Sequence, residues 1–142
     1  MPTKITTRFQ ELLKRPKLLV MAGGFSPLHA RMSEVLGYEA FFMSGSQVAA
    51  YLYGYPDVGL LGLGEMVEAA RRLAAGCNIP IFADADTGYG NAVNAYHTVK
   101  EFIRAGVAGV LADGNDVTAN LIVHVHPADQ LPYPEDRLRI GY

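Results

Sequence analysis

The stretch Ile81-Phe82-Ala83-Asp84-Ala85-Asp86-Thr87-Gly88-Tyr89-Gly90 joins an apolar run to two carboxylates and two glycines. The apolar residues 79–83 have the length of a buried strand, and the acids come where that strand ends. Glycines directly after such a run indicate a turn. The stretch therefore predicts a strand that ends in a polar loop able to carry chemistry.

The same strand-then-helix alternation extends to both sides of this stretch. Ser26 suits an N-cap, Pro27 the first helical position and Gly37 the position after a helix end, while Gly106 ends another helix. A capping-box spacing at Thr7-Arg8-Phe9-Gln10 opens a short helix before Pro16. Strands are predicted at 18–22, 39–43, 79–83 and 107–112, and helices at 27–36, 64–75 and 92–105.

Continuous apolar strands that alternate with helices predict an α/β fold with a parallel sheet covered on both faces. A doubly wound sheet and a barrel both fit this pattern. Polar residues gather after the strands, at 44–46 and 84–91. Both architectures place their sites at that end of the strands.

The pattern changes after Ala112. Residues 114–120 fit neither the periodicity of a helix nor that of a strand. Pro127, Pro132 and Pro134 interrupt the last stretch. Residues 122–126 fit one strand, with alternate residues on opposite faces. We divide the chain into a strand-helix part at 1–112, which the resemblance described below implies is a partial barrel, and a divergent tail at 113–142.

The formal net charge of -2 and the pI of ≈ 6.0 come without any block of Lys or Arg. We therefore expect no nucleic-acid or anionic-lipid partner. The single Cys77 cannot form a disulfide within the chain, which favours a reducing, cytoplasmic location. The apolar run at 18–22 is too short to cross a bilayer, so we expect no membrane partner.

Asp84 and Asp86 are candidate metal ligands. Mg²⁺ prefers oxygen donors and commonly takes one or two carboxylates, with water and substrate oxygens completing its shell. The alternative is that both aspartates only cap turns. A dinucleotide site is disfavoured, because Gly88-Tyr89-Gly90 lacks the third glycine and the preceding acids would repel a pyrophosphate.

Ser44-Gly45-Ser46 follows a predicted strand, where successive N–H groups can face a carboxylate or an enolate oxygen. An ordinary strand-to-helix turn with Ser46 as a helix cap is the favoured explanation when this segment is considered without the other motifs. Asp57 lies in a turn-rich aromatic segment and is either a metal-linked acid or simply solvated. His124 and His126, with Asp129 nearby, form a weaker candidate metal site.

Six strings carry a resemblance over roughly residues 8–110: Ala22-Gly23-Gly24-Phe25, Leu28-His29-Ala30-Arg31, Gly37-Tyr38-Glu39-Ala40, Ser44-Gly45-Ser46, Tyr55-Pro56-Asp57 and Asp84-Ala85-Asp86-Thr87-Gly88-Tyr89-Gly90. In this order and spacing they resemble the phosphoenolpyruvate mutase and isocitrate lyase superfamily. The last string is the most specific. Similar members include methylisocitrate lyases, dimethylmalate lyase, oxaloacetate hydrolases or decarboxylases, and carboxyphosphonoenolpyruvate mutases.

The resemblance implies about four strand-helix units of a (β/α)8 barrel, a homo-oligomer, Mg²⁺, and a small 2-oxo or 2-hydroxy carboxylate that reacts through an enolate. At the matching positions, Ser44-Gly45-Ser46 would bind the substrate carboxylate and oxyanion. Asp57, Asp84 and Asp86 would hold Mg²⁺ directly or through water. These roles are expectations from the resemblance.

The chain departs from the superfamily after Val110. The superfamily continues with His-x-Glu-Asp-Gln and, in lyases, a gating loop with Lys-Lys-Cys-Gly-His, but here Leu111-Ala112-Asp113 follows. Asp113 stands where that Glu would be. A complete barrel takes about 250 residues. The alternative is therefore a truncated, catalytically inactive half-barrel that associates with another chain through exposed sheet edges.

Overall fold

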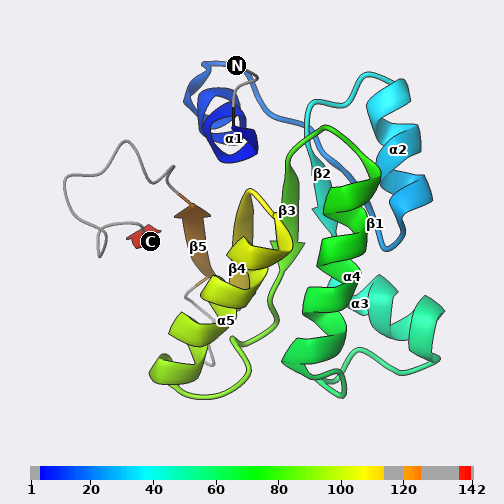
Figure 1. Cartoon of the computed structure of the whole chain (residues 1–142), viewed down its shortest axis with the longest axis vertical. Helices are drawn as coiled ribbons and strands as arrows, with labels where there is room; N and C mark the ends of the chain where they lie inside the picture. Colours follow the sequence, from blue (N-terminus) through cyan, green and yellow to red (C-terminus); the bar gives the residue numbers. More distant parts are fainter. Residues whose placement is uncertain (1–3, 114–119, 126–137, 142) are drawn as a thin grey trace.

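The computed structural model of the chain describes residues 4–113, 120–125 and 138–141 (Figure 1). Helices and strands alternate through the first of these ranges. The helical elements are α1 (Ile5–Lys14), α2 (Pro27–Val35), α3 (Gly45–Val48), the π-helical turn η1 (Ala49–Tyr53), α4 (Leu63–Gly76) and α5 (Ala92–Ala105). The strands are β1 (Ala22–Gly24), β2 (Phe41–Met43), β3 (Ile81–Asp84), β4 (Gly109–Asp113), β5 (Asn120–Val125) and β6 (Leu138–Gly141).

The strands form one sheet in chain order. The first four pair in parallel, with Phe41 opposite both Ala22 and Ile81, which confirms the predicted parallel α/β class. β5 pairs with β4 in the antiparallel direction, and β6 pairs with β5 in the same way. β4 is therefore not an exposed edge of the sheet, because β5 supplies the partner for its backbone groups.

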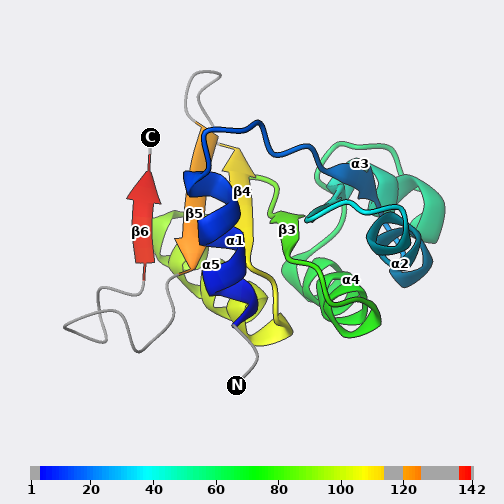
Figure 2. The ribbon, with the colours of Figure 1, turned by 90° about the horizontal axis from the view of Figure 1, so that it is seen from above.

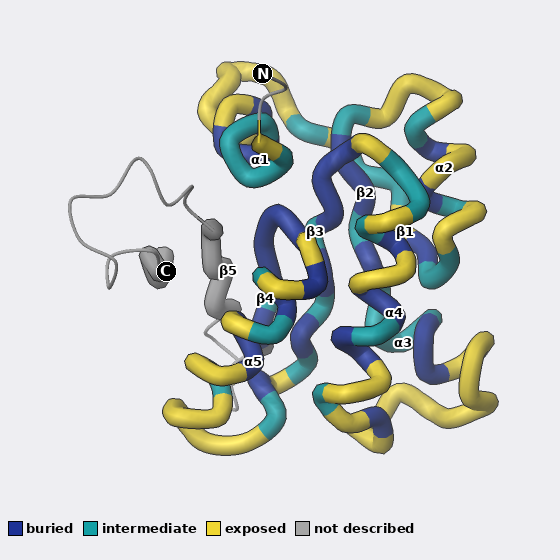
Figure 3. Tube along the Cα trace, in the orientation of Figure 1, coloured by how far each residue is buried: buried dark blue, intermediate teal, exposed yellow. Residues whose placement is uncertain are grey.

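Different helices cover the two faces of the sheet. Phe41 and Ile81 are buried in a core shared with α2, α4 and α5. Phe82 points to the opposite face, as alternation along a strand requires, and its ring lies 5.6 Å from that of Phe9 in α1. Figure 2 shows α1 on the face opposite α5, and Figure 3 shows the central strands buried beneath exposed helix surfaces.

Local signals set the ends of α2 and α5. The Ser26 hydroxyl accepts a hydrogen bond from His29 N–H at 3.3 Å, which confirms Ser26 as the N-cap of α2. Asn91 caps α5, and Gly106 ends it with φ +94. Neither of these helices, nor any other in the described part of the chain, is long and apolar enough to cross a membrane.

Two predicted boundaries are wrong. The opening helix begins at Ile5 after Lys4, without a side-chain cap, so Thr7 lies inside it and is not its N-cap. The strand predicted at 18–22 is found at Ala22–Gly24. Only these residues lie opposite Phe41–Met43 of β2, so the preceding residues have no strand partner and Leu18 is 82% exposed.

The tail contains more regular structure than its sequence suggests. The possible strand at 122–126 is largely confirmed by β5, although His126 lies outside the described residues. β6 was not predicted, because its short apolar character gives no clear period next to the prolines. β6 forms a strand because it pairs with β5. The two strands are separated along the chain, so the local sequence of β6 does not reveal this pairing.

Candidate active site

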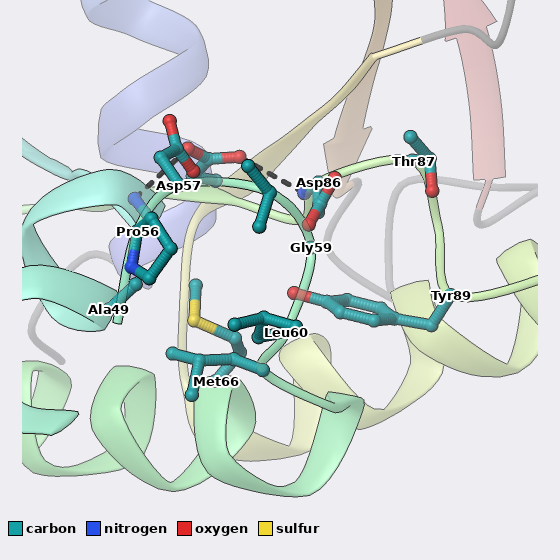
Figure 4. A pocket seen from close by; sticks show the side chains of 13 residues that line it. Ala49, Pro56, Asp57, Gly59, Leu60, Met66, Asp86, Thr87 and Tyr89 are labelled. Carbon is teal, nitrogen blue, oxygen red and sulfur yellow. Dashed lines mark hydrogen bonds between the residues drawn. The ribbon is translucent and has the colours of Figure 1, made fainter. Parts of the chain in front are cut away.

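A pocket of ≈ 530 Å³ opens at the carboxyl ends of β2 and β3. Ser44 directly follows β2, and Asp84 is the last residue of β3, so the parallel pairing brings two predicted site segments together. Ligands of open α/β sheets and barrels bind at this end of the strands. The pocket is lined by Gly45, Ala49, Pro56, Asp57, Val58, Gly59, Leu60, Leu61, Met66, Asp84, Asp86, Thr87 and Tyr89 (Figure 4).

The carboxylate of Asp84 is fixed by two backbone donors. Gly45 N–H donates to Oδ2 at 3.0 Å, and Asp86 N–H donates to Oδ1 at 3.0 Å. A Cβ at position 45 would lie only 2.8 Å from Oδ2, so glycine permits this close approach. The Ser44-Gly45-Ser46 turn therefore orients an acid that is 39 residues away.

Asp86 and Asp57 reach the same pocket from two loops. Asp86 has φ +49, in the left-handed region that is uncommon for residues other than glycine. Its Oδ2 would lie 3.6 Å from a Cβ placed on Gly59, so the loop that carries Asp57 passes close to it. Figure 4 shows Asp86 beside Gly59 of that loop, with Asp57 farther to the left. The three predicted acids thus line one cavity.

These acids provide oxygen donors of the kind that Mg²⁺ prefers. Among the residues that the structure describes, no three His, Cys, Asp or Glu side chains group closely enough to hold an ion by themselves. The donor set fits a magnesium ion held by one or two carboxylates together with water or substrate oxygens. His124 belongs to β5, whereas His126 and Asp129 lie outside the described residues.

The serines of the predicted substrate loop lie beside the pocket lining. Ser44 caps α3 by accepting a hydrogen bond from Gln47 N–H at 3.4 Å, and its hydroxyl shares another of 2.9 Å with Ser46. Ser44, and not Ser46, is therefore the helix cap at this turn. The role of both serines in substrate binding stays a prediction.

Tyr89 is a pocket residue that sequence reasoning missed. Its hydroxyl is buried and has no hydrogen-bond partner among the described residues. Burial, followed by the negative charges of Asp86, Asp84 and Glu65, raises the pKa of Tyr89 far above its usual range. The available signal was a bulky residue between two glycines, Gly88 and Gly90.

Cys77 lies at the opposite end of the strands, between α4 and β3. Its thiol contacts the carbonyl oxygens of Leu73 and Ile79, each at 3.6 Å. Burial raises the pKa of the Cys77 thiol. This environment is that of a packing residue and not of a reactive thiol.

Comparison with known proteins identifies the family. The sequence profile of phosphoenolpyruvate phosphomutase matches residues 9–129. The chain is 46% identical over 107 residues to chloroplastic carboxyvinyl-carboxyphosphonate phosphorylmutase of Arabidopsis thaliana, covering 75% of this chain and 32% of that protein. It is 43% identical over 101 residues to 2,3-dimethylmalate lyase of Eubacterium barkeri, covering 71% and 35%. The chain thus spans about a third of the length of these relatives.

Solved structures give the same result for the fold. Oxaloacetate acetylhydrolase superposes with a TM-score of 0.75 at 31% identity, over 81% of this chain and 41% of that one. A phosphonopyruvate hydrolase in complex with oxalate and Mg²⁺ superposes with a TM-score of 0.76 at 27% identity, over 82% and 41%. The matched structures are barrels of the TIM type, so the four parallel strands correspond to part of such a barrel. The chain belongs to the phosphoenolpyruvate phosphomutase family, within the isocitrate lyase and phosphoenolpyruvate mutase superfamily.

Proposed function

We propose that this chain carries the magnesium-binding and carboxylate-binding part of a lyase or mutase site. The substrate class would be small 2-oxo or 2-hydroxy carboxylates, which react through an enolate. The observation that carries this proposal is the convergence of Asp57, Asp84 and Asp86 on one pocket at the carboxyl ends of parallel strands. The names of the relatives support it, because they include a dimethylmalate lyase and an oxaloacetate decarboxylase.

Asp84 and Asp86 would hold Mg²⁺, and Asp57 would reach it through water. The ion would supply Lewis-acid stabilisation of the negative charge that develops on an enolate oxygen. Gly45 N–H already donates to Asp84, so its part in this site is to orient the acid. Ser46 would then provide the hydrogen bonds that the substrate carboxylate needs.

Titration calorimetry of the 142-residue chain with Mg²⁺ tests this proposal. We expect Asp84→Asn and Asp86→Asn to weaken binding about tenfold or more, because each removes a charged ligand. Asparagine keeps the shape of the side chain and one acceptor oxygen, but at position 84 its amide nitrogen also replaces an oxygen that accepts a backbone N–H, so Asp86→Asn is the cleaner of the two variants. Glu11→Gln, an exposed acid on α1, is the matched control. If the wild type and the three variants give equal heats of Mg²⁺ binding, Asp84 and Asp86 are not the metal ligands.

A separate observation favours a second candidate function, in which the chain acts only in association with another copy of itself. Leu28, Met32 and Val35 lie on one stripe of α2 that continues to its C-cap Leu36, and each of the four is between 52% and 74% exposed. A contiguous exposed apolar stripe marks an interaction surface. Under this alternative the half-barrel has no turnover of its own, and its assembly is the property to measure.

A further inference from the structure

The loop between β3 and α5 holds Tyr89 in an uncommon backbone conformation. Its φ of +58 lies in the left-handed region, which a bulky residue adopts only when its surroundings enforce it. Thr98 of α5, which is 1% exposed, donates a hydrogen bond of 2.9 Å to the carbonyl oxygen of the preceding Gly88. This anchor sets the direction of the chain immediately before the tyrosine.

As a result, the ring of Tyr89 points into the pocket and not toward solvent. Figure 4 shows its hydroxyl directed toward Leu60 and Met66, below the loop that carries Asp57. Neither neighbour offers a polar group, and the hydroxyl lacks a hydrogen-bond partner in the described part of the chain. Buried hydroxyl groups are normally paired, so an unpaired one at a pocket wall calls for an explanation.

The chemistry of the surroundings restricts what this hydroxyl can do. Burial and the carboxylates of Asp86, Asp84 and Glu65 oppose ionisation and raise the pKa of Tyr89. The phenol therefore keeps its proton at neutral pH and is a hydrogen-bond donor. Its natural partner is an acceptor oxygen on a bound molecule.

We infer that Tyr89 is a positioning residue that donates its hydroxyl hydrogen bond to an oxygen of the small carboxylate in this pocket. This inference rests on the proposed function, since it assumes that carboxylate ligand. Leu60 is 58% exposed, so its side chain can move when a ligand oxygen reaches the hydroxyl. Tyr89 would select ligands that place an acceptor oxygen beside Leu60.

The test is titration of the full chain with oxalate in the presence of excess Mg²⁺. Tyr89→Phe removes the hydroxyl and keeps the ring. We expect it to weaken oxalate binding about tenfold or more, since hydrogen bonds to charged groups are the stronger kind, and to leave Mg²⁺ binding unchanged. We also expect a slightly higher melting temperature, because the variant no longer buries an unpaired hydroxyl. Tyr96→Phe, at an exposed position on α5, is the matched control and should bind oxalate like the wild type.

The outcomes separate this inference from the proposed function. If Asp84→Ala abolishes oxalate binding while Tyr89→Phe binds oxalate like the wild type, the role of Tyr89 is overturned and the carboxylate site stands. A lower melting temperature with unchanged oxalate affinity would likewise overturn it, in favour of a structural hydroxyl. If the wild-type chain binds no oxalate with Mg²⁺, the proposed function and the role of Tyr89 fall together.

Discussion

Gly45 and Asp84 form the contact on which the rest of the site depends. A backbone N–H donates to one carboxylate oxygen, and Asp86 N–H donates to the other. Hydrogen bonds to an ionised carboxylate are roughly twice as strong as those between neutral groups. The acid is therefore oriented by the fold itself, which lowers the side-chain entropy that Asp84 would otherwise lose when a ligand binds.

Replacement of Gly45 by alanine should disturb this contact directly. The added methyl group would lie 2.8 Å from Asp84 Oδ2, so the carboxylate must move. Overpacking of this kind costs about 1–3 kcal/mol, and we expect Mg²⁺ affinity to fall about tenfold. Gly64→Ala is the control, because a Cβ at position 64 meets nothing within 4 Å. Calorimetry showing equal Mg²⁺ affinity for Gly45→Ala and the wild type would contradict the orienting role.

Tyr89 should make the stability of the chain sensitive to alkaline pH. Burial raises the pKa of its phenol, followed by the charges of Asp86, Asp84 and Glu65. The unfolded chain releases this proton near pH ~10, whereas the folded chain keeps it. The stabilising contribution is thus complete below pH ~10 and is lost as the pH rises above it.

Melting temperatures measured near pH ~8 and pH ~11 test this expectation. The wild type should lose more stability between the two than Tyr89→Phe does, because the other tyrosines titrate equally in both proteins. Equal losses would show that the phenol of Tyr89 ionises in the folded chain as easily as in the unfolded one.

For individual residues, the sequence predicted which acids belong to the site but not the hydrogen bonds and neighbours that orient the site residues. Asp84 and Asp86 could be identified because they follow an apolar strand. The donor from Gly45 could not, because it depends on how β2 and β3 pair across 39 residues. The direction of Tyr89 depends on the sign of its φ and on the contact between Thr98 and Gly88, which no spacing encodes.

Among the elements, α5 supports the loop that carries the site. Thr98→Val should leave the carbonyl oxygen of Gly88 buried without its donor. We expect a loss of about 1–3 kcal/mol in the free energy of unfolding, together with weaker Mg²⁺ binding as the loop relaxes. Urea denaturation measures the first effect and calorimetry the second. Thr98→Ser keeps the hydroxyl and should bind Mg²⁺ like the wild type; equal weakening in both variants would assign the effect to packing and not to the hydrogen bond.

Elements with local signals were predicted well, and elements defined by distant partners were not. α5 has an Asn91 cap and a terminal Gly106, so its predicted bounds match the structure. β1 was displaced because its extent depends on which residues oppose β2. The π-helical turn Ala49–Tyr53 was missed, because its short apolar run has no period that separates it from a loop.

On the scale of the whole molecule, α2 presents an apolar stripe that remains exposed among the described residues. Met32 and Val35 lie at its centre on α2, beside the edge strand β1. In a closed barrel the helices form an outer ring, in which each helix lies beside the helices of the neighbouring units. Matched structures are more than twice as long as the aligned part of this chain, so in them further units are available for such packing.

We therefore expect the isolated 142-residue chain to associate through α2, with a second copy as the occupant. Met32→Glu combined with Val35→Glu places two like charges on the stripe, so it should shift the chain toward monomer in light scattering at equal concentration. Val93→Glu is the matched control, because Val93 is 78% exposed on α5 and lies away from the stripe; it should leave the association unchanged.

Exposed apolar area drives this association, so the wild type should also dissociate more readily in the cold, where the hydrophobic effect weakens. A wild-type chain that elutes as a sharp monomer and melts cooperatively would contradict the expectation, and would mean that the exposed stripe of α2 is tolerated in solution without a partner.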